Sequence, residues 1–357
     1  MGKGSGGWRR RIVTFGLAAA ALLFVAYLVP IRDRCADPGT VAAAPRVPVS
    51  RDGNTCILHR PLGDVRLSEA ECKALVCDPG LSSTLGRARL DLVALLALVY
   101  LAGTFVWAAR WRALLRLANA PVSLLSAWRI TLESQAGGVL LPGGVAGDAL
   151  RIASIVGRGA PLATVVASVM LDRAIGLATL AGLAAGLAAA FEPGAIGPAV
   201  LVLASIPLGI AAGLAVLRIG PIRRAKILDH RRLAGTVKPI LEYLGEPRAP
   251  RAILVALAAS FVLSAIQLGV IRGLCTALGN EPTVERWVYT GSAITFVLGI
   301  IPAVPGGWGT SDAAFVLFLG RAGIAASTAF AVALLYRLDW YLSAAIGAAL
   351  YATRRQK

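Results

Sequence analysis

The sequence contains six runs of mostly apolar residues that are each long enough to cross a lipid bilayer as a helix. A helix needs roughly 20 such residues to span about 30 Å of hydrocarbon. The runs are Ile12–Ile31, Leu90–Ala109, Ala163–Ala190, Ile196–Leu217, Ala252–Leu278 and Ile324–Tyr351. Hydrophobic residues make up 57% of the chain and charged residues only 15%, which is too little polar surface for a soluble domain of 357 residues. The sequence therefore predicts an all-α fold, a polytopic transmembrane helical bundle.

Basic residues lie between these runs and predict the orientation of the chain. The formal net charge of +17 does not indicate a nucleic-acid partner, because no binding motif and no basic face with interleaved aromatic residues accompanies it. Loops rich in Lys and Arg stay on the cytoplasmic side of a membrane. Basic clusters precede the first run, follow the second at Arg110–Arg116, fill residues 218–251 and end the chain. Both termini are therefore predicted to be cytoplasmic.

Three parts follow from this orientation. Residues 1–31 are predicted to form a cytoplasmic tail and a first transmembrane helix. We interpret that helix as an uncleaved anchor, because no small-x-small cleavage site precedes Arg32. Residues 32–89 are predicted to be an extracytoplasmic loop, and residues 90–357 the main transmembrane domain.

Four of the five cysteines lie in the predicted external loop: Cys35, Cys56, Cys72 and Cys77. Cysteines confined to an exported segment indicate two disulfides, for which three connectivities exist. A zinc site is the weaker interpretation, because the loop has no Cys-x-x-Cys pair and only one histidine, His59. The loop would act as a lid, as a docking module for a partner, or as a stabilised connector.

Two similar sequences interrupt apolar surroundings, "LLPGGVAGDALR" at residues 140–151 and "IPAVPGGWGTSD" at residues 301–312. Proline cannot continue a helix, and glycine adopts backbone angles that other residues resist. Such a break is tolerated at membrane depth only where it is buried in protein or lines a wet cavity. The apolar stretches Val122–Leu141 and Trp287–Ile301 lead into the breaks. Together with the charge pattern, they predict two re-entrant Pro-Gly-Gly hairpins that enter from opposite faces, as in an inverted repeat.

A new half-helix is expected to begin after each break, with its free amide groups and positive dipole end directed at the gap. This arrangement is typical of anion sites and suits a phosphate. Asp148 and Asp312 lie in the first turns, where each either complements the helix dipole or serves a shared central cavity. Arg151 follows Asp148 by three residues, so the two can pair or can jointly contact a head group.

Further charged residues lie within the predicted spans. These are Glu133, Asp172, Arg173, Arg272, Arg337 and Asp339. Charge at membrane depth usually faces a bundle interior or a cavity. For Arg272 and Asp339 we favour internal ion pairs that fix packing, and for Asp172, Arg173 and Arg337 a functional role is an equal alternative. Asp172 and Arg173 are adjacent in sequence, so they point apart on a helix and are expected to have different partners.

Four ordered motifs resemble the lysylphosphatidylglycerol synthase transmembrane family of flippase-like membrane proteins: "LLPGGVAGDALRI" (140–152), "SVMLDRAIGL" (168–177), "IPAVPGGWGTSDAAFVLFLG" (301–320) and "ALLYRLDWYL" (333–342). In the first motif Ala146 replaces a glycine of the family pattern, and Asp312 stands where the family usually has Glu. The resemblance covers residues from about Leu90 to the C-terminus. It implies translocation of an anionic or aminoacylated lipid, or a polyprenyl-phosphate-linked lipid, across a bacterial inner membrane.

The motifs and charges give the predicted substrate-binding residues. These are Pro142, Gly143, Gly144, Gly147, Asp148, Arg151, Asp172, Arg173, Pro305, Gly306, Gly307, Gly309, Asp312 and Arg337. Lipid head groups and the bilayer are the expected partners. Some family members carry a soluble aminoacyl-transferase domain, and none follows Lys357 in this sequence, so a separate lipid-synthesising enzyme is a further expected partner. We predict no catalytic residue, metal or cofactor.

Three functions are consistent with these observations. The first is a lipid flippase; because the sequence has no Gly-x4-Gly-Lys-Ser/Thr loop for nucleotides, transport would be equilibrative or coupled to an ion, with a proton carried by Asp148 or Asp312. The second is an intramembrane transferase that uses one of these aspartates as general base. The third is a membrane scaffold that acts through its external loop.

Overall fold

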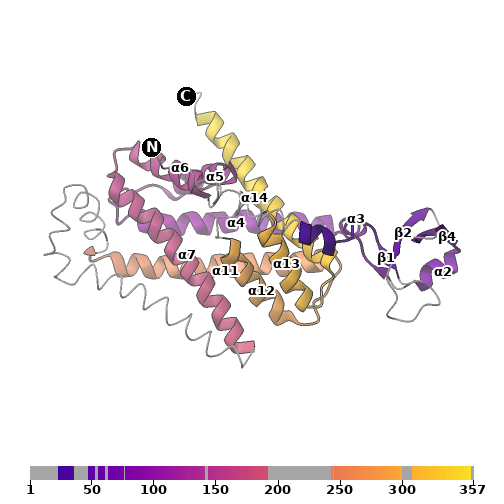
Figure 1. Ribbon diagram of the computed structural model, residues 1–357. Helices are drawn as coiled ribbons and strands as arrows, with labels where there is room; N and C mark the ends of the chain where they lie inside the picture. The colour runs from indigo at the N-terminus through magenta and orange to yellow at the C-terminus, as the bar shows by residue number, and fades with distance from the viewer. Residues whose placement is uncertain are drawn as a thin grey trace, which may run out of the picture. The chain divides into compact units, whose positions relative to one another are not determined.

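The computed structural model describes residues 23–35, 47–52, 55–60, 63–75, 77–140, 144–191, 243, 245–299 and 308–354. Figure 1 shows that most of this chain is helical. The long helices are α4 (Leu90–Leu115), α7 (Leu162–Phe191), α11 (Ala249–Ala277) and α14 (Ala326–Arg354). Each is long and apolar enough to cross a membrane, so four of the six predicted spans are confirmed as candidate membrane-spanning helices. The predicted span Ile196–Leu217 lies outside the described residues, as does most of Ile12–Ile31.

Large apolar side chains on these long helices are exposed. Leu98 of α4, Met170 of α7 and Leu254 of α11 are each more than 60% exposed. In water this apolar surface would stay in contact with solvent, whereas in a bilayer it is covered by lipid tails. The distribution of apolar residues therefore agrees with a multi-pass membrane protein.

Two pairs of shorter helices flank the Pro-Gly-Gly sequences. They are α5 (Leu124–Leu140) with α6 (Val145–Val156), and α12 (Glu285–Gly299) with α13 (Thr310–Arg321). Helices α6 and α13 have 12 residues each, a length of about 18 Å that cannot span a bilayer. Pro142 and Gly143, and likewise Pro305, Gly306 and Gly307, lie outside the described residues.

Close contacts show that the two helices of each short pair lie side by side. A Cβ atom added to Gly147 of α6 would lie 2.3 Å from the carbonyl oxygen of Ser134 in α5. In the second pair the rings of Trp287 and Phe318 stack with centroids 6.4 Å apart. The short helices on either side of each break are present, while the re-entrant hairpins, their entry from opposite membrane faces and the inverted repeat stay predictions.

The chain divides into two compact units. Unit 1 consists of residues 1–96, 271–292 and 308–337, and unit 2 of residues 97–270, 293–307 and 338–357. Unit 2 has an apolar core around Trp111, Ile130 and Ile155, to which α4, α5 and α6 contribute. Unit 1 holds the predicted external loop, α13 and residues 285–292 of α12, whereas residues 293–299 of α12 belong to unit 2.

The external loop contains a five-stranded antiparallel sheet with the strand order β4-β3-β2-β1-β5. Its strands are β1 (Arg34–Cys35), β2 (Val47–Asp52), β3 (Thr55–Arg60), β4 (Gly63–Leu67) and β5 (Cys77–Asp78), and its helices are α2 (Glu69–Ala74) and α3 (Leu81–Gly86). The all-α prediction is wrong for this segment. Alternating residues such as Val49, Cys56 and Leu58 bury one face of the sheet.

Two disulfides close this small domain. Cys35 is bonded to Cys77, and Cys56 to Cys72, which confirms the predicted pair of bridges and selects one of the three connectivities. Cys275 of α11 is a buried free thiol. The apolar core of the sheet is small, so the bridges supply stability that burial alone cannot give a domain of this size.

Candidate functional site

Helix α6 begins at a backbone conformation that favours glycine. Gly144 is its N-cap residue and has a φ of 71°, in the left-handed region. No side chain caps the helix there, so the first amide groups of α6 have no side-chain acceptor at the cap position. The positive end of the helix dipole thus lies at Gly144, the last residue of the first Pro-Gly-Gly sequence.

An arginine from a different helix lies against this helix start. The guanidinium of Arg173, in α7, approaches Gly144 so closely that an added Cβ atom would lie 2.7 Å from its Nη2. Arg173 also forms an ion pair with Asp148, with 2.9 Å between Nη2 and Oδ2. The side chain of Arg173 is 41% exposed and that of Asp148 23% exposed. This pair is therefore open to solvent or to a ligand.

A second set of charges is fully buried in the same unit. Asp172 accepts hydrogen bonds from Nε and Nη2 of Arg110, at 2.7 and 3.1 Å, and from Nη1 of Arg151, at 3.3 Å. The indole nitrogen of Trp107 donates to the same carboxylate at 3.2 Å. Both Asp172 and Arg151 have about 1% of their side chains exposed. Two buried arginines thus share one aspartate.

Arg151 is held on several sides. Its Nε donates to the hydroxyl of Ser134 at 3.0 Å, and its guanidinium stacks over the rings of Trp107 and Trp111 at 4.6 and 5.0 Å. Its Nη2 is buried and has no hydrogen-bond partner among the described residues. Among the described residues, the acidic partners of Arg110, Arg151 and Arg173 are Asp148 and Asp172, so this group of five residues, the α6 charge cluster, carries one net positive charge.

The α6 charge cluster agrees in part with the sequence prediction. Asp172 and Arg173 have different partners, as expected for neighbours on a helix. Arg151 forms its salt bridge with Asp172 rather than with Asp148, although the i, i+3 spacing favoured Asp148. Arg110 was assigned only to a basic cytoplasmic cluster. Since α4 continues to Leu115, Arg110 instead lies inside the helix and is 6% exposed.

The second Pro-Gly-Gly segment has a different charge arrangement, within unit 1. Asp312 is buried, and its Oδ2 accepts a hydrogen bond from the amide of Gly309, the N-cap residue of α13, at 2.9 Å. Arg337 of α14 binds the same carboxylate, with 2.8 Å between Nη2 and Oδ1. The guanidinium of Arg337 also lies 3.9 Å above the ring of Trp308. Asp312 therefore caps α13 and neutralises Arg337.

Asp148 and Asp312 are not structurally equivalent. Asp312 is the third residue after its N-cap glycine, whereas Asp148 is the fourth after Gly144. Only Asp312 reaches back to the N-cap amide. Asp148 is instead held by the part-exposed Arg173.

Other intramembrane charges form local ion pairs. Arg272 binds Glu281 and Glu285, so the predicted ion pairing is present, but both carboxylates are exposed and the pair is not internal. Glu133 pairs with Arg129 at 2.9 Å. Asp339 forms no ion pair among the described residues, so the pairing predicted for it is not seen.

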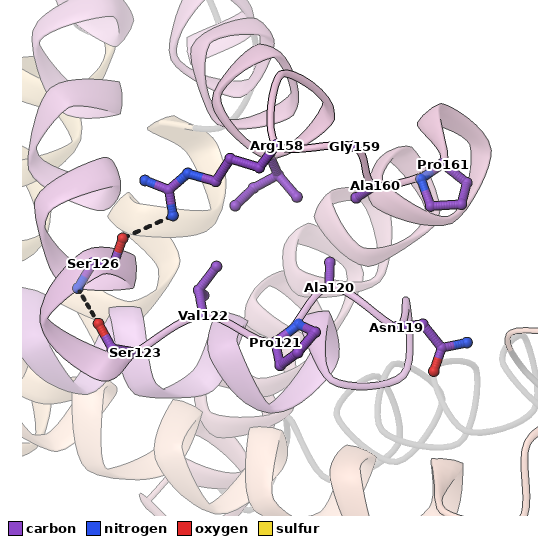
Figure 2. A pocket seen from close by; sticks show the side chains of 11 residues that line it. Asn119, Ala120, Pro121, Val122, Ser123, Ser126, Arg158, Gly159, Ala160 and Pro161 are labelled. Carbon is purple, nitrogen blue, oxygen red and sulfur yellow. Dashed lines mark hydrogen bonds between the residues drawn. The ribbon is translucent and has the colours of Figure 1, made fainter.

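A pocket of about 380 Å³ lies at the opposite end of α6, between the segment after α4 and the turn before α7. Figure 2 shows Arg158 at this pocket, where it donates to the hydroxyl of Ser126 at 2.9 Å. The rest of the lining is mixed, with apolar residues such as Pro121 and Val122 beside the polar side chains of Asn119 and Ser123. Because Arg158 follows Gly144 by 14 residues, the length of α6, about 20 Å, separates this pocket from the start of the helix and the Arg173–Asp148 pair.

The external domain contains a hydrogen-bonded chain of Ser50, His59 and Asp64 on three neighbouring strands. The serine hydroxyl lies 2.9 Å from Nε2 of His59, and Nδ1 of His59 lies 3.0 Å from Asp64. This is the order of a hydrolase triad. However, the Asp64 side chain is 57% exposed and that of His59 32%, so water competes for each bond. We interpret the chain as cross-strand pairing. Among the described residues no group of His, Cys, Asp and Glu is arranged to hold a metal.

Gly147 fixes the distance between α5 and α6, which is a role that the motif alone did not indicate. We expect Gly147→Ala to lower the free energy of unfolding by about 1–3 kcal/mol, because its methyl group would collide with backbone rather than with a movable side chain. Gly186→Ala in α7 is the matched control, since nothing lies within 4 Å of its added Cβ. Thermal unfolding of both purified variants in one detergent measures the difference, and equal midpoints would contradict the close approach.

The comparison with known protein families gives one match. The family described as the lysylphosphatidylglycerol synthase TM region matches residues 80–347. No curated protein and no solved structure matches the chain. The matched range includes both short helix pairs, the α6 charge cluster and the Asp312–Arg337 pair.

Proposed function

The chain belongs to the lysylphosphatidylglycerol synthase transmembrane family, and from this premise we propose that it moves a phosphate-bearing lipid between the two leaflets of a membrane. The lipid is an anionic or aminoacylated phospholipid, or a polyprenyl-phosphate-linked lipid. We also propose that the protein lies in a bacterial inner membrane, with both termini in the cytoplasm and residues 32–89 on the other side. A separate enzyme would supply the lipid.

The observation that carries this proposal is the open ion pair at the start of α6. Arg173 and the uncapped amide groups after Gly144 both favour an anion. Asp148 occupies Arg173 when no ligand is present. A lipid phosphate would displace Asp148 and receive two parallel hydrogen bonds from the guanidinium.

The buried part of the cluster supports the same ligand. Arg110 and Arg151 place a positive charge behind the helix start that Asp172 alone does not neutralise. In surroundings of low dielectric this charge acts over a longer range than it would in water. The phosphate would thus balance the α6 charge cluster, while the lipid tails stay among the exposed apolar side chains of the long helices.

The short helices provide a route in this proposal. If the α5–α6 and α12–α13 hairpins enter from opposite faces, both helix starts lie away from the membrane surfaces, and alternating movement of the hairpins exposes the head group to each side in turn. The transferase alternative is less well supported. Asp148 and Asp312, the aspartates that it needs as general bases, are each bound to an arginine.

The test is lipid movement in proteoliposomes with Arg173→Gln. We expect the variant to move the preferred lipid at least tenfold more slowly. This factor corresponds to the loss of one charge-assisted hydrogen bond, which contributes roughly 1.5–3 kcal/mol. The panel contains an anionic phospholipid, an aminoacylated phospholipid and a polyprenyl phosphate, each fluorescently labelled.

Arg158→Gln is the matched control, because it removes an exposed arginine just beyond the far end of α6. We expect it to keep the wild-type rate. If Arg173→Gln also moved every lipid at the wild-type rate, the α6 start would not be the binding site. If wild-type protein accelerated no lipid over empty liposomes, the transport function itself would be rejected.

A further inference from the structure

Asp339 is a buried carboxylate for which the charge clusters described above supply no partner. It lies on α14, is 5% exposed, and its Oδ2 has no hydrogen-bond partner among the described residues. The other buried aspartates, Asp172 and Asp312, are each bound by arginine. Asp339 therefore needs a different explanation.

The position of Asp339 follows from how α14 packs on α5 within unit 2. A Cβ atom added to Gly347 would lie 2.0 Å from the carbonyl oxygen of Leu132, and the hydroxyl of Ser343 donates to Oε1 of Gln135 at 2.6 Å. These contacts pair lower numbers on α14 with higher numbers on α5, so the two helices run antiparallel. Asp339 is one turn beyond Ser343 on the same face.

This register puts Asp339 level with Val139 and Leu140, the last residues of α5 before the Pro-Gly-Gly turn. The last carbonyl groups of a helix have no intrahelical donor and form the negative end of its dipole. A second negative charge is disfavoured there, whereas a protonated carboxyl group can donate a hydrogen bond to a carbonyl oxygen.

Among the described residues of α4, α5 and α14, no positive charge pairs with Asp339. On α5 the charged residues Arg129 and Glu133 bind each other, and Arg129 also donates to the carbonyl of Leu350 at 2.6 Å. On α4 the titratable neighbour is Tyr100, which interacts electrostatically with Asp339. On α14 itself Arg337 is bound to Asp312, and a spacing of two residues places it on another face from Asp339.

Gln135 adds an independent observation. Its Nε2 is also buried and without a hydrogen-bond partner among the described residues. A donor and an acceptor are thus both unsatisfied along one buried helix contact. An ionised carboxylate at this depth would be far more costly than a neutral one, and such groups take up a proton instead.

We propose that Asp339 is a proton-binding site at the end of α5. It holds a proton while α5 and α14 are packed as observed, and it releases the proton when movement of the α5–α6 hairpin admits water. This assigns the coupling proton to Asp339, because arginine already binds Asp148 and Asp312. The coupling rests on the proposed lipid transport, but the proton site itself does not.

Infrared spectroscopy of the full-length protein in lipid nanodiscs tests the site without any transport measurement. Near pH 7 an ordinary aspartate, with a pKa of about 3.9, is almost entirely ionised. We expect wild-type protein to show a protonated carboxylic-acid C=O band at this pH, and Asp339→Asn to lose it. Glu133→Gln, which removes a buried but ion-paired carboxylate of the adjacent helix, should keep the band.

Two outcomes would overturn the proton site. The first is identical wild-type and Asp339→Asn spectra in the carboxylic-acid region between about pH 6 and about pH 8, which would mean an ionised Asp339. The second is failure of Asp339→Asn to fold, as judged by size-exclusion chromatography and circular dichroism. Asn is the neutral mimic of the protonated side chain, so a protonated site must accept it.

Lipid movement then tests the coupling separately. Over the same range the wild-type rate should change by at least about threefold with pH, and Asp339→Asn should be nearly independent of pH. Retained pH dependence in Asp339→Asn would reject the coupling and leave the infrared result standing. If wild-type protein moved no lipid, the proposed function would be rejected. The infrared carboxylic-acid band would still show whether Asp339 holds a proton.

Discussion

Replacement of Asp172 by Asn is expected to lower the free energy of unfolding by about 3–5 kcal/mol. The carboxylate is the shared partner of Arg110 and Arg151, both of which are nearly inaccessible to solvent. Asn keeps the size of the side chain but removes its charge, so two buried guanidinium groups lose their only compensating charge in this contact. Removal of one member of a buried ionic group is far more destabilising than loss of a surface pair.

Asp148→Asn is the control for this prediction. It removes the carboxylate of a part-exposed ion pair in the same charge cluster, and we expect a change of no more than about 1 kcal/mol. Chemical unfolding of both variants in one detergent gives the comparison. A wild-type stability for Asp172→Asn would mean that another acceptor neutralises the two arginines.

The double variant Asp172→Asn with Arg110→Met refines the interpretation. Met removes one of the two uncompensated charges and keeps an apolar side chain of similar length, so part of the lost stability should return. Purely additive losses would instead indicate that Arg110 and Asp172 stabilise the protein independently. Their 2.7 Å contact makes that outcome inconsistent with the structure.

Hydrophobic run length was enough to locate the long helices. Helices α4, α7, α11 and α14 coincide with predicted spans, because the requirement for about 20 apolar residues is a strong constraint that needs no knowledge of tertiary contacts. The short helices on either side of Gly144 were also predictable, since proline and glycine act on the local backbone.

The partners within the charge cluster were not predictable in the same way. Spacing along one helix suggested that Arg151 would meet Asp148, yet Arg151 binds Asp172, which is 21 residues away. Arg110 precedes Asp172 by 62 residues. Because it lies near the end of an apolar run, it resembled the basic residues that mark the cytoplasmic side of a membrane. Such pairings depend on how helices pack, and the sequence periodicity of a single helix does not contain that information.

The external sheet was missed for a different reason. Its strands are six residues or fewer, and the buried positions include cysteines that the sequence identified only as disulfide partners. Short alternating segments between turn residues give a weak signal. Because the small sheet depends on its bridges, its stability can be separated experimentally from that of the helices.

The paired replacement of Cys35 and Cys77 by Ser is expected to destabilise the external domain by about 4 kcal/mol. The bridge joins residues 42 apart in sequence, and the entropy of the unfolded chain rises when so long a loop is opened. The Cys56–Cys72 bridge spans only 16 residues, so its removal should cost about 3 kcal/mol. Amide hydrogen exchange in strand β3 measures both variants under the same conditions. Equal protection in wild-type and both variants would contradict a stabilising role for the bridges.

The same variants separate a transporter from a scaffold. If the external domain is a connector, loss of the Cys35–Cys77 bridge should unfold the sheet and leave lipid movement within about twofold of wild type, because no residue of the α6 charge cluster belongs to that domain. A scaffold acting through the loop would show the reverse: its function would be lost with the bridge and would survive Arg173→Gln. Since Arg173 and Cys35 belong to different compact units, the two replacements test separate parts of the chain, and a double variant with additive effects would show that they act independently.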